Sequence, residues 1–474
     1  MANITNDVFF ATISELAAKL RAKEFSCVEL TRAFTDRFEK LAPQYNAMAL
    51  SLRKEALSQA KDVDRELKRD RTRGALQGIP YGAKDLFAVA GHPTTWGARP
   101  YAAQVFKEDA RVIQKLTSAK AILIGKLSMI ELAGGGNYSS AGASLTGPGL
   151  NPWDRERWSG GSSSGPGSAV AAGLVTFALG SETSGSILTP AAFCGVTGLR
   201  PTYGLVSRTG AMALSWTLDK IGPMCRSAED CALVLHEIAG ADTQDQSSSG
   251  RGFNYTPRFQ RKPAEITIGY SKADFEGWED PGARATFGAA LEVIKAQGFV
   301  LKEVKLPDFP YGALLSTILA GEAGSIFEEF IRSGQVDQLA DAQQIAGLKS
   351  YLDVPATDYL RAMRVRSLVQ EAIHELMLDV HVLLSPTRYE IAPRVSDSLD
   401  RRGPGPIPPA GGLSSMIPAA NLAGLPALSL PCGFVEGLPV AISLVGRAFY
   451  ENQLVGIGNA FQKQTDWHRR KPPM

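Results

Sequence analysis

Apolar residues in the first part of the chain recur at helical spacing among charged ones. Leu16 and Leu20 are four residues apart, and Leu30, Phe34 and Phe38 continue the same interval among Lys, Arg and Glu. This spacing places apolar side chains on one face of a helix, where they can pack against a core. We therefore expect the N-terminal 70 residues to form a helical layer.

Beyond residue 78, short strand-like runs alternate with helix-like ones. The clearest of these runs span 121–124, 168–179, 266–270, 285–296 and 380–384. Alternation of strands with helices is typical of an α/β sheet with helices on both faces. The pattern predicts an α/β fold, in which one large domain holds a central mixed, twisted sheet covered by helices on both faces.

The expected domain covers residues 1–474 and has four parts along the chain. These are a helical N-terminal layer at 1–70, a catalytic core at 78–240, a variable helical and loop region at 241–412, and a C-terminal part of the core at 413–474. Two segments interrupt the alternation: 242–262 is polar and 387–412 is rich in proline. Long irregular segments of this kind are binding loops or solvated surface excursions, and the sequence leaves both open.

Composition excludes several classes of partner. Lys and Arg together number 50 against 48 Asp and Glu, so no charge excess favours a polyanion or an anionic membrane surface. The five cysteines are scattered, as expected for reduced thiols in the cytoplasm. The start of the chain lacks the features of a secretion signal, and no apolar run is long enough to cross a bilayer. We expect a cytoplasmic protein without nucleic-acid or membrane partners.

Two loops of small residues carry serines that could act as nucleophiles. Ser162 lies in the run Gly-Gly-Ser-Ser-Ser-Gly at 160–165, and Ser186 ends the run Gly-Ser-Glu-Thr-Ser-Gly-Ser at 180–186. A hydroxyl needs a neighbouring base at neutral pH. Lys84 ends an apolar run, where burial would favour its neutral, basic form, although a lysine beside Asp85 is more often a solvated ion pair.

Read together, these three segments resemble the amidase signature family. Further segments follow the family's order, namely Gly125 and Lys126, Asn151 to Asp154 with Arg157, Phe193 to Thr202, Asn421 to Pro426, and Gly437 to Val440. The resemblance extends from about residue 12 to the end of the chain. It implies an enzyme that cleaves linear amide bonds without a cofactor.

The resemblance assigns a role to each residue of the predicted catalytic set. Ser186 would be the nucleophile, Ser162 the bridging serine after a cis peptide bond from Gly161, and Lys84 the terminal base. Ser186 would form an acyl-enzyme that water then hydrolyses. The tight turn of Thr183, Ser184, Gly185 and Ser186 can supply backbone N–H groups for an oxyanion hole. Here Ser184 and Gly185 replace the family's pair of glycines, and Glu182 replaces its Asp.

The substrate prediction depends on charges near the nucleophile. Family members that bind carboxylate-bearing amides have an arginine two or three residues past the nucleophile, where Leu188 and Thr189 stand here. We therefore expect a neutral, partly apolar amide, such as an aryl or alkyl amide, with ester or carbamate side activity. Met129, Gly134 and Gly135 are expected to line the substrate pocket. The predicted partner is this small amide, and a homodimer is left open.

Two other enzymes fit parts of the sequence. One is the catalytic amidotransferase subunit that supplies ammonia from glutamine to a tRNA-linked substrate, but Leu188 and Ser414 stand where it carries an arginine and an acid. The other is an α/β-hydrolase-type esterase with Ser163 as nucleophile and His468 as base, although its nucleophile turn requires a preceding strand. No histidines or cysteines lie at zinc-ligand spacing, so we expect no metal.

Overall fold

A single mixed sheet of 11 strands forms the centre of the molecule in the computed structural model, which describes residues 4–257, 261–400, 405, 407 and 409–473. From one edge to the other, its strands are β1 (Met48–Ser51), β3 (Ile122–Leu127), β2 (Pro80–Lys84), β6 (Phe177–Glu182), β8 (Lys220–Cys225), β7 (Thr197–Arg200), β12 (Ala427–Val435), β13 (Leu438–Gly446), β11 (Val382–Pro386), β9 (Thr267–Tyr270) and β10 (Val300–Glu303). Strands β3, β2 and β6 are parallel to one another, and so are β11, β9 and β10. The strands between these two groups pair in antiparallel fashion.

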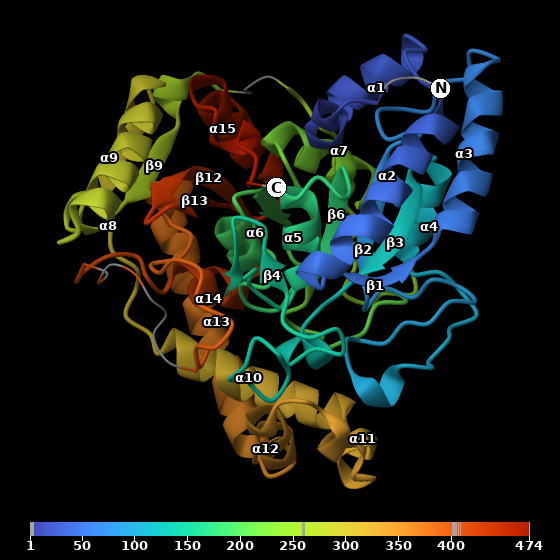
Figure 1. The fold of residues 1–474 in the computed structure, drawn as a ribbon. Coiled ribbons are helices and arrows are strands. Elements are labelled where there is room, and N and C mark those ends of the chain that lie inside the picture. The colour runs from blue at the N-terminus through green and yellow to red at the C-terminus, as the bar shows by residue number, and fades with distance from the viewer. Residues whose placement is uncertain (1–3, 258–260, 401–404, 406, 408, 474) are drawn as a thin grey trace.

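Helices flank this sheet (Figure 1). The α-helices are α1 (Ile13–Arg21), α2 (Cys27–Leu41), α3 (Arg53–Leu67), α4 (Arg111–Ser118), α5 (Ser164–Ala171), α6 (Leu188–Cys194), α7 (Ala228–Ile238), α8 (Ala273–Glu276), α9 (Pro281–Ala296), α10 (Tyr311–Ile326), α11 (Glu328–Arg332), α12 (Ala342–Tyr351), α13 (Ala356–Asp379), α14 (Met416–Leu422) and α15 (Glu451–Gln464). A separate pair, β4 (Leu150–Asn151) and β5 (Asp154–Trp158), precedes α5.

Side chains in the middle of the sheet show that both of its faces are covered. A Cβ placed on Gly198 of β7 would meet Ala191 of α6, whereas Gly458 of α15 lies against Leu428 of β12. Leu428 pairs with Leu199, the neighbour of Gly198. Because successive residues of a strand point to opposite faces, α6 and α15 lie on opposite sides of the sheet.

The predicted single α/β domain with a mixed sheet and two helical faces is confirmed. The N-terminal segment forms α1, α2 and α3, together with the unpredicted strand β1. Ser26 begins α2 because its side chain accepts from the amide of Glu29, whose carboxylate accepts in return from the amide of Ser26. The finer division of the domain into four parts stays a prediction, although β9, β10 and β11 of region 241–412 join the same sheet as the core.

The helices of region 241–412 and the two segments that interrupt the alternation can also be located. Helices α10, α11 and α12 lie together at one end of the molecule, below the sheet in Figure 1. Part of the polar segment 242–262 and part of the proline-rich segment 387–412 lie outside the described residues. In the described part of the chain, no helix is both long and apolar enough to cross a membrane.

Candidate active site

Lys84 is the last residue of β2 and is completely buried. Strands β2 and β6 are parallel, so their carboxyl ends lie at the same edge of the sheet and bring Lys84 beside the turn after β6. The Lys84 Nζ lies 2.7 Å from Ser162 Oγ and 3.0 Å from Ser181 Oγ. Two of the three predicted catalytic side chains are therefore in direct contact.

Burial makes Lys84 a base near neutral pH. It lowers the pKa of Lys84 from 10.5 to about 7, and the carboxylates of Asp219 and Glu182 oppose the shift without cancelling it. The neighbouring Asp85 does not pair with Lys84. Its carboxylate instead lies 2.6 Å from the ammonium of Lys126, and both side chains are buried. Lys84 is thus free of the solvated ion pair that its sequence context also suggested.

Glu182 fixes the turn that carries Ser186. Its buried carboxylate accepts from the backbone N–H groups of Ile187 and Leu188 at 2.9 and 3.1 Å. It also accepts from Arg200 at 2.8 Å and from Asn421 at 3.0 Å. Burial alone would raise the pKa of Glu182, but the Arg200 guanidinium outweighs burial and lowers it to about 2. The turn is therefore anchored by a permanent anion that reaches the first amides of α6.

The turn leaves a set of backbone donors unused. In the described residues, the N–H groups of positions 183–186 have no hydrogen-bond acceptor. Gly185 has a φ of +83°, a backbone conformation in which a glycine avoids the clash that a Cβ would cause. Donors that are held in place and point at no protein acceptor are suited to stabilise a developing oxyanion.

Ser162 and Ser186 are brought close, but their hydroxyls do not touch. The peptide bond between Gly161 and Ser162 is cis, and the amide of Ser163 donates to the carbonyl of Ser186 at 3.3 Å. Among the described residues, the Ser186 hydroxyl has no hydrogen-bond partner. A rotation of the Ser186 side chain or an intervening water is needed to complete a path to Ser162.

Ser186 opens into a cavity of about 880 Å³, within the size range of small-molecule sites. Its lining includes Gly134, but neither Met129, which is fully buried, nor Gly135, which abuts Leu214. The cavity also carries charged side chains that no sequence motif indicated, and these are Arg388, Glu390, Asp397 and Asp400. All four come from the proline-rich segment, whose composition was the only signal that it could be a binding loop.

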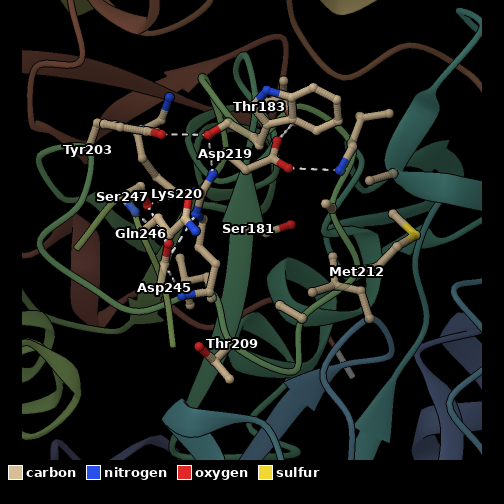
Figure 2. A pocket seen from close by; sticks show the side chains of 18 of the residues that line it. Ser181, Thr183, Tyr203, Thr209, Met212, Asp219, Lys220, Asp245, Gln246 and Ser247 are labelled. Carbon is tan, nitrogen blue, oxygen red and sulfur yellow. Dashed lines mark hydrogen bonds and ion pairs between the residues drawn. The ribbon is translucent and has the colours of Figure 1, made fainter. Parts of the chain in front are cut away.

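A second cavity, of about 620 Å³, is lined by Thr183 and Asp219 among other residues (Figure 2). Thr183 lines both cavities, and its hydroxyl donates to Asp219 at 2.6 Å. Asp219 also accepts from the amides of Leu214 and Ser215 at 2.8 and 2.9 Å. Burial raises the pKa of Asp219, while these three donors stabilise its anion. Asp219 thereby holds the first residue of the nucleophile turn, a role that the sequence reasoning missed.

The alternative esterase set does not come together. The Ser163 hydroxyl donates to the carbonyl of Ser181 at 3.2 Å, and His468 lies near the C-terminus beside Arg226. Burial lowers the pKa of His468 to about 4. No cluster of three or more His, Cys, Asp or Glu that could hold a metal ion occurs among the residues that the structure describes.

Comparison with known proteins places the chain in a family. Residues 29–455 match the Amidase family model. The chain is 37% identical to the A subunit of glutamyl-tRNA(Gln) amidotransferase from Methylococcus capsulatus, with 97% of this chain and 98% of that protein covered. The chain belongs to the amidase family, whose members carry the amidase signature, and is an enzyme that acts on amide C–N bonds.

Solved structures agree with this assignment. The native peptide amidase from Stenotrophomonas maltophilia superposes with a TM-score of 0.84 at 29% identity, with 98% of both chains covered. The A subunit of glutamyl-tRNA(Gln) amidotransferase from Thermotoga maritima gives a TM-score of 0.78 at 29% identity, over 99% of this chain and 98% of that one.

The relatives overturn the predicted function and partners. The prediction of a simple hydrolase for a neutral, partly apolar amide is wrong, because full-length relatives at 34–37% identity are amidotransferase subunits. The predicted partners, a small amide and at most a second copy without nucleic acid, are also wrong, since those relatives are named as subunits of a glutamyl-tRNA(Gln) enzyme. The substrate argument counted only charges near the nucleophile in sequence. Leu188 is instead buried in the same hydrophobic cluster as Met416, and the charges of the cavity come from residues 388–400.

Proposed function

We propose that this chain is the amide-cleaving catalytic subunit of an amidotransferase, which releases ammonia from the side-chain amide of glutamine. The observation that carries the proposal is similarity to amidotransferase A subunits over nearly the whole of both chains. Contact between Lys84 and Ser162 supports it, because glutamine is an unactivated amide whose cleavage needs a strong nucleophile. The ammonia would pass to a tRNA-linked acceptor on partner subunits, as the names of the relatives imply.

The proposed reaction uses the neutral form of Lys84. Lys84 accepts the proton of Ser162, which accepts the proton of Ser186, and Ser186 Oγ attacks the amide carbon. Backbone N–H groups of residues 183–186 stabilise the oxyanion. When the C–N bond breaks, the proton returns through the relay to the leaving nitrogen and ammonia departs. Water then attacks the acyl-enzyme, and the relay takes its proton and returns it to Ser186 Oγ.

A cytoplasmic location follows from the same proposal, since charged tRNA is found there. All five cysteines are unpaired and buried, which supports a reducing compartment. Fractionation of the native host tests this point, and recovery of the chain outside the cytoplasmic fraction would contradict it.

The test measures ammonia released from L-glutamine by the tagged chain, isolated from its native host with any associated subunits. Ser186→Ala should abolish release, because the proposed nucleophile is gone. Ser58→Ala, on the exposed side of α3, is the matched control and should keep full activity. Equal ammonia release from the wild-type and Ser186→Ala proteins would refute the assignment. Release from simple amides but never from glutamine would refute the amidotransferase role.

A further inference from the structure

The cavity in front of Ser186 has an uneven distribution of charge. Of the described residues that line it, one is cationic, Arg388, and three are anionic, Glu390, Asp397 and Asp400. The remaining lining is apolar or neutral, with Trp158, Phe193, Leu315 and Leu319 among it. Charges therefore concentrate on one wall of an otherwise uncharged cavity.

Arg388 has donors that the protein does not use. Its Nη2 donates to the carboxylate of Glu390, its Nε is buried without a partner, and its Nη1 makes no hydrogen bond among the described residues. A partly exposed ion pair adds little to stability, and a buried donor without a partner reduces it. Stability alone gives no reason for this arrangement. A guanidinium whose Nη1 is unused at the wall of a cavity is, however, suited to donate a charge-assisted hydrogen bond to a carboxylate.

The chain holds Arg388 and Glu390 toward the cavity by anchoring the residue between them. Tyr389 donates from its hydroxyl to Asp274 at 2.7 Å and stacks on Trp278, with 5.9 Å between ring centroids. Tyr389 does not line the cavity, whereas its two neighbours do. The cation and the anion are thus presented side by side on the same wall.

We propose that Arg388 and Glu390 recognise the zwitterionic head group of an α-amino acid amide, with Arg388 binding the α-carboxylate and Glu390 the α-ammonium. Asp397 and Asp400 add negative charge that favours the ammonium. This assignment rests on the proposed function and deepens it, because it supplies the charges for glutamine that positions 188 and 414 lack. Position 188 cannot supply the charge, because Leu188 is apolar and buried in the core.

Four substrates with the same scissile amide separate the two contacts. L-glutamine carries both charges, glutaramate only the carboxylate, 4-aminobutanamide only the ammonium, and butanamide neither. Arg388→Gln should lower kcat/KM for glutamine and glutaramate by about 10- to 100-fold, the usual effect of removing hydrogen bonds to a charged group. It should change the other two substrates less than about twofold, since neither has a carboxylate.

Glu390→Gln should show the opposite selectivity. It should lower kcat/KM for glutamine and 4-aminobutanamide and spare glutaramate and butanamide. Arg388→Lys should restore part of the glutamine activity, because a lysine keeps the charge without the planar fork. Arg394→Gln is the matched control. Arg394 lies on the same segment as Arg388 and pairs with Glu156 of β5, but it does not line the cavity, so its loss should leave the kinetics of all four substrates unchanged.

The outcomes separate the proposal from a structural role. An equal loss on butanamide and glutamine in Arg388→Gln would overturn it, as would unchanged glutamine kinetics. If the wild type releases ammonia from none of the four substrates, the proposed function fails. The head-group proposal is then tested separately, by measuring the binding of L-glutamate. Calorimetry with the Ser186→Ala protein should then show L-glutamate binding that weakens at least tenfold in Ser186→Ala/Arg388→Gln. Absent or equal binding overturns the proposal.

Discussion

The pH dependence of activity tests the role of Lys84 most closely. With a pKa of about 7, roughly half of Lys84 is neutral at pH 7, whereas at its ordinary value of 10.5 only about one molecule in 3,000 would be. Burial therefore raises the fraction of Lys84 that is neutral at pH 7 by about three orders of magnitude. We expect kcat/KM to fall about tenfold per pH unit below the pKa, and to reach a plateau above about pH 8.

Asp219→Asn provides the perturbation that identifies the titrating group. The Asp219 carboxylate raises the pKa of Lys84, so its neutralisation should move the acid limb to lower pH. The asparagine can still bond Thr183 and the two amides that Asp219 holds, which preserves the turn. The assay is ammonia release from glutamine between pH 5.5 and 9, on both proteins and on Lys84→Ala.

Two results would exclude Lys84 as the group that controls the pH profile. An acid limb that stays in place or moves to higher pH in Asp219→Asn would show that Lys84 does not control the profile. Retention of the same pH dependence in Lys84→Ala would assign the titration to another group. Denaturation curves of each variant establish that altered profiles do not arise from partial unfolding.

Two further predictions concern stability. Glu182→Gln should destabilise the protein by about 3 to 5 kcal/mol in urea denaturation, because the completely buried Arg200 then lacks its counter-charge. A loss of less than about 1 kcal/mol would contradict the importance of this ion pair. Gly222→Ala should lower stability by about 1 to 3 kcal/mol or more, since its Cβ would lie 2.1 Å from the Leu199 carbonyl oxygen. Gly252→Ala meets nothing within 4 Å and should leave thermal unfolding almost unchanged, and equal effects of the two would contradict the packing argument.

Periodicity located the parts of the fold whose apolar patterns are regular. Ranges 266–270 and 380–384 become β9 and β11, and range 285–296 lies within α9. The apolar stretch 168–179 divides into the end of α5 and the start of β6, because a continuous apolar run does not distinguish a buried helix from a buried strand. The long strands β12 and β13 were missed, since Pro431 and Pro439 interrupt the strand pattern and the register shifts after Pro431.

Within the site, residues in short local motifs could be predicted from the sequence, whereas residues brought in by long-range contacts could not. Motifs located Lys84 and Ser162, which lie 2.7 Å apart, because each belongs to a short segment with a distinctive composition. Arg388 is 202 positions from Ser186 in the sequence. The residues around Arg388 form no motif that predicts its position just after the end of β11, where it lines the same cavity as Ser186. Asp219 likewise reaches Thr183 only through the pairing of β8 with β6. Tertiary structure therefore brings together the charged residues that line this cavity.

In the proposed mechanism, Lys84 activates Ser186 through Ser162, and Ser186 carries the acyl group. The most direct measurement is mass spectrometry of the protein after brief reaction with an activated γ-glutamyl ester and an acid quench. We expect one γ-glutamyl group per chain, located by peptide mapping on Ser186 and absent from Ser186→Ala. A γ-glutamyl group on any other residue, or turnover that continues undiminished in Ser186→Ala, would contradict it.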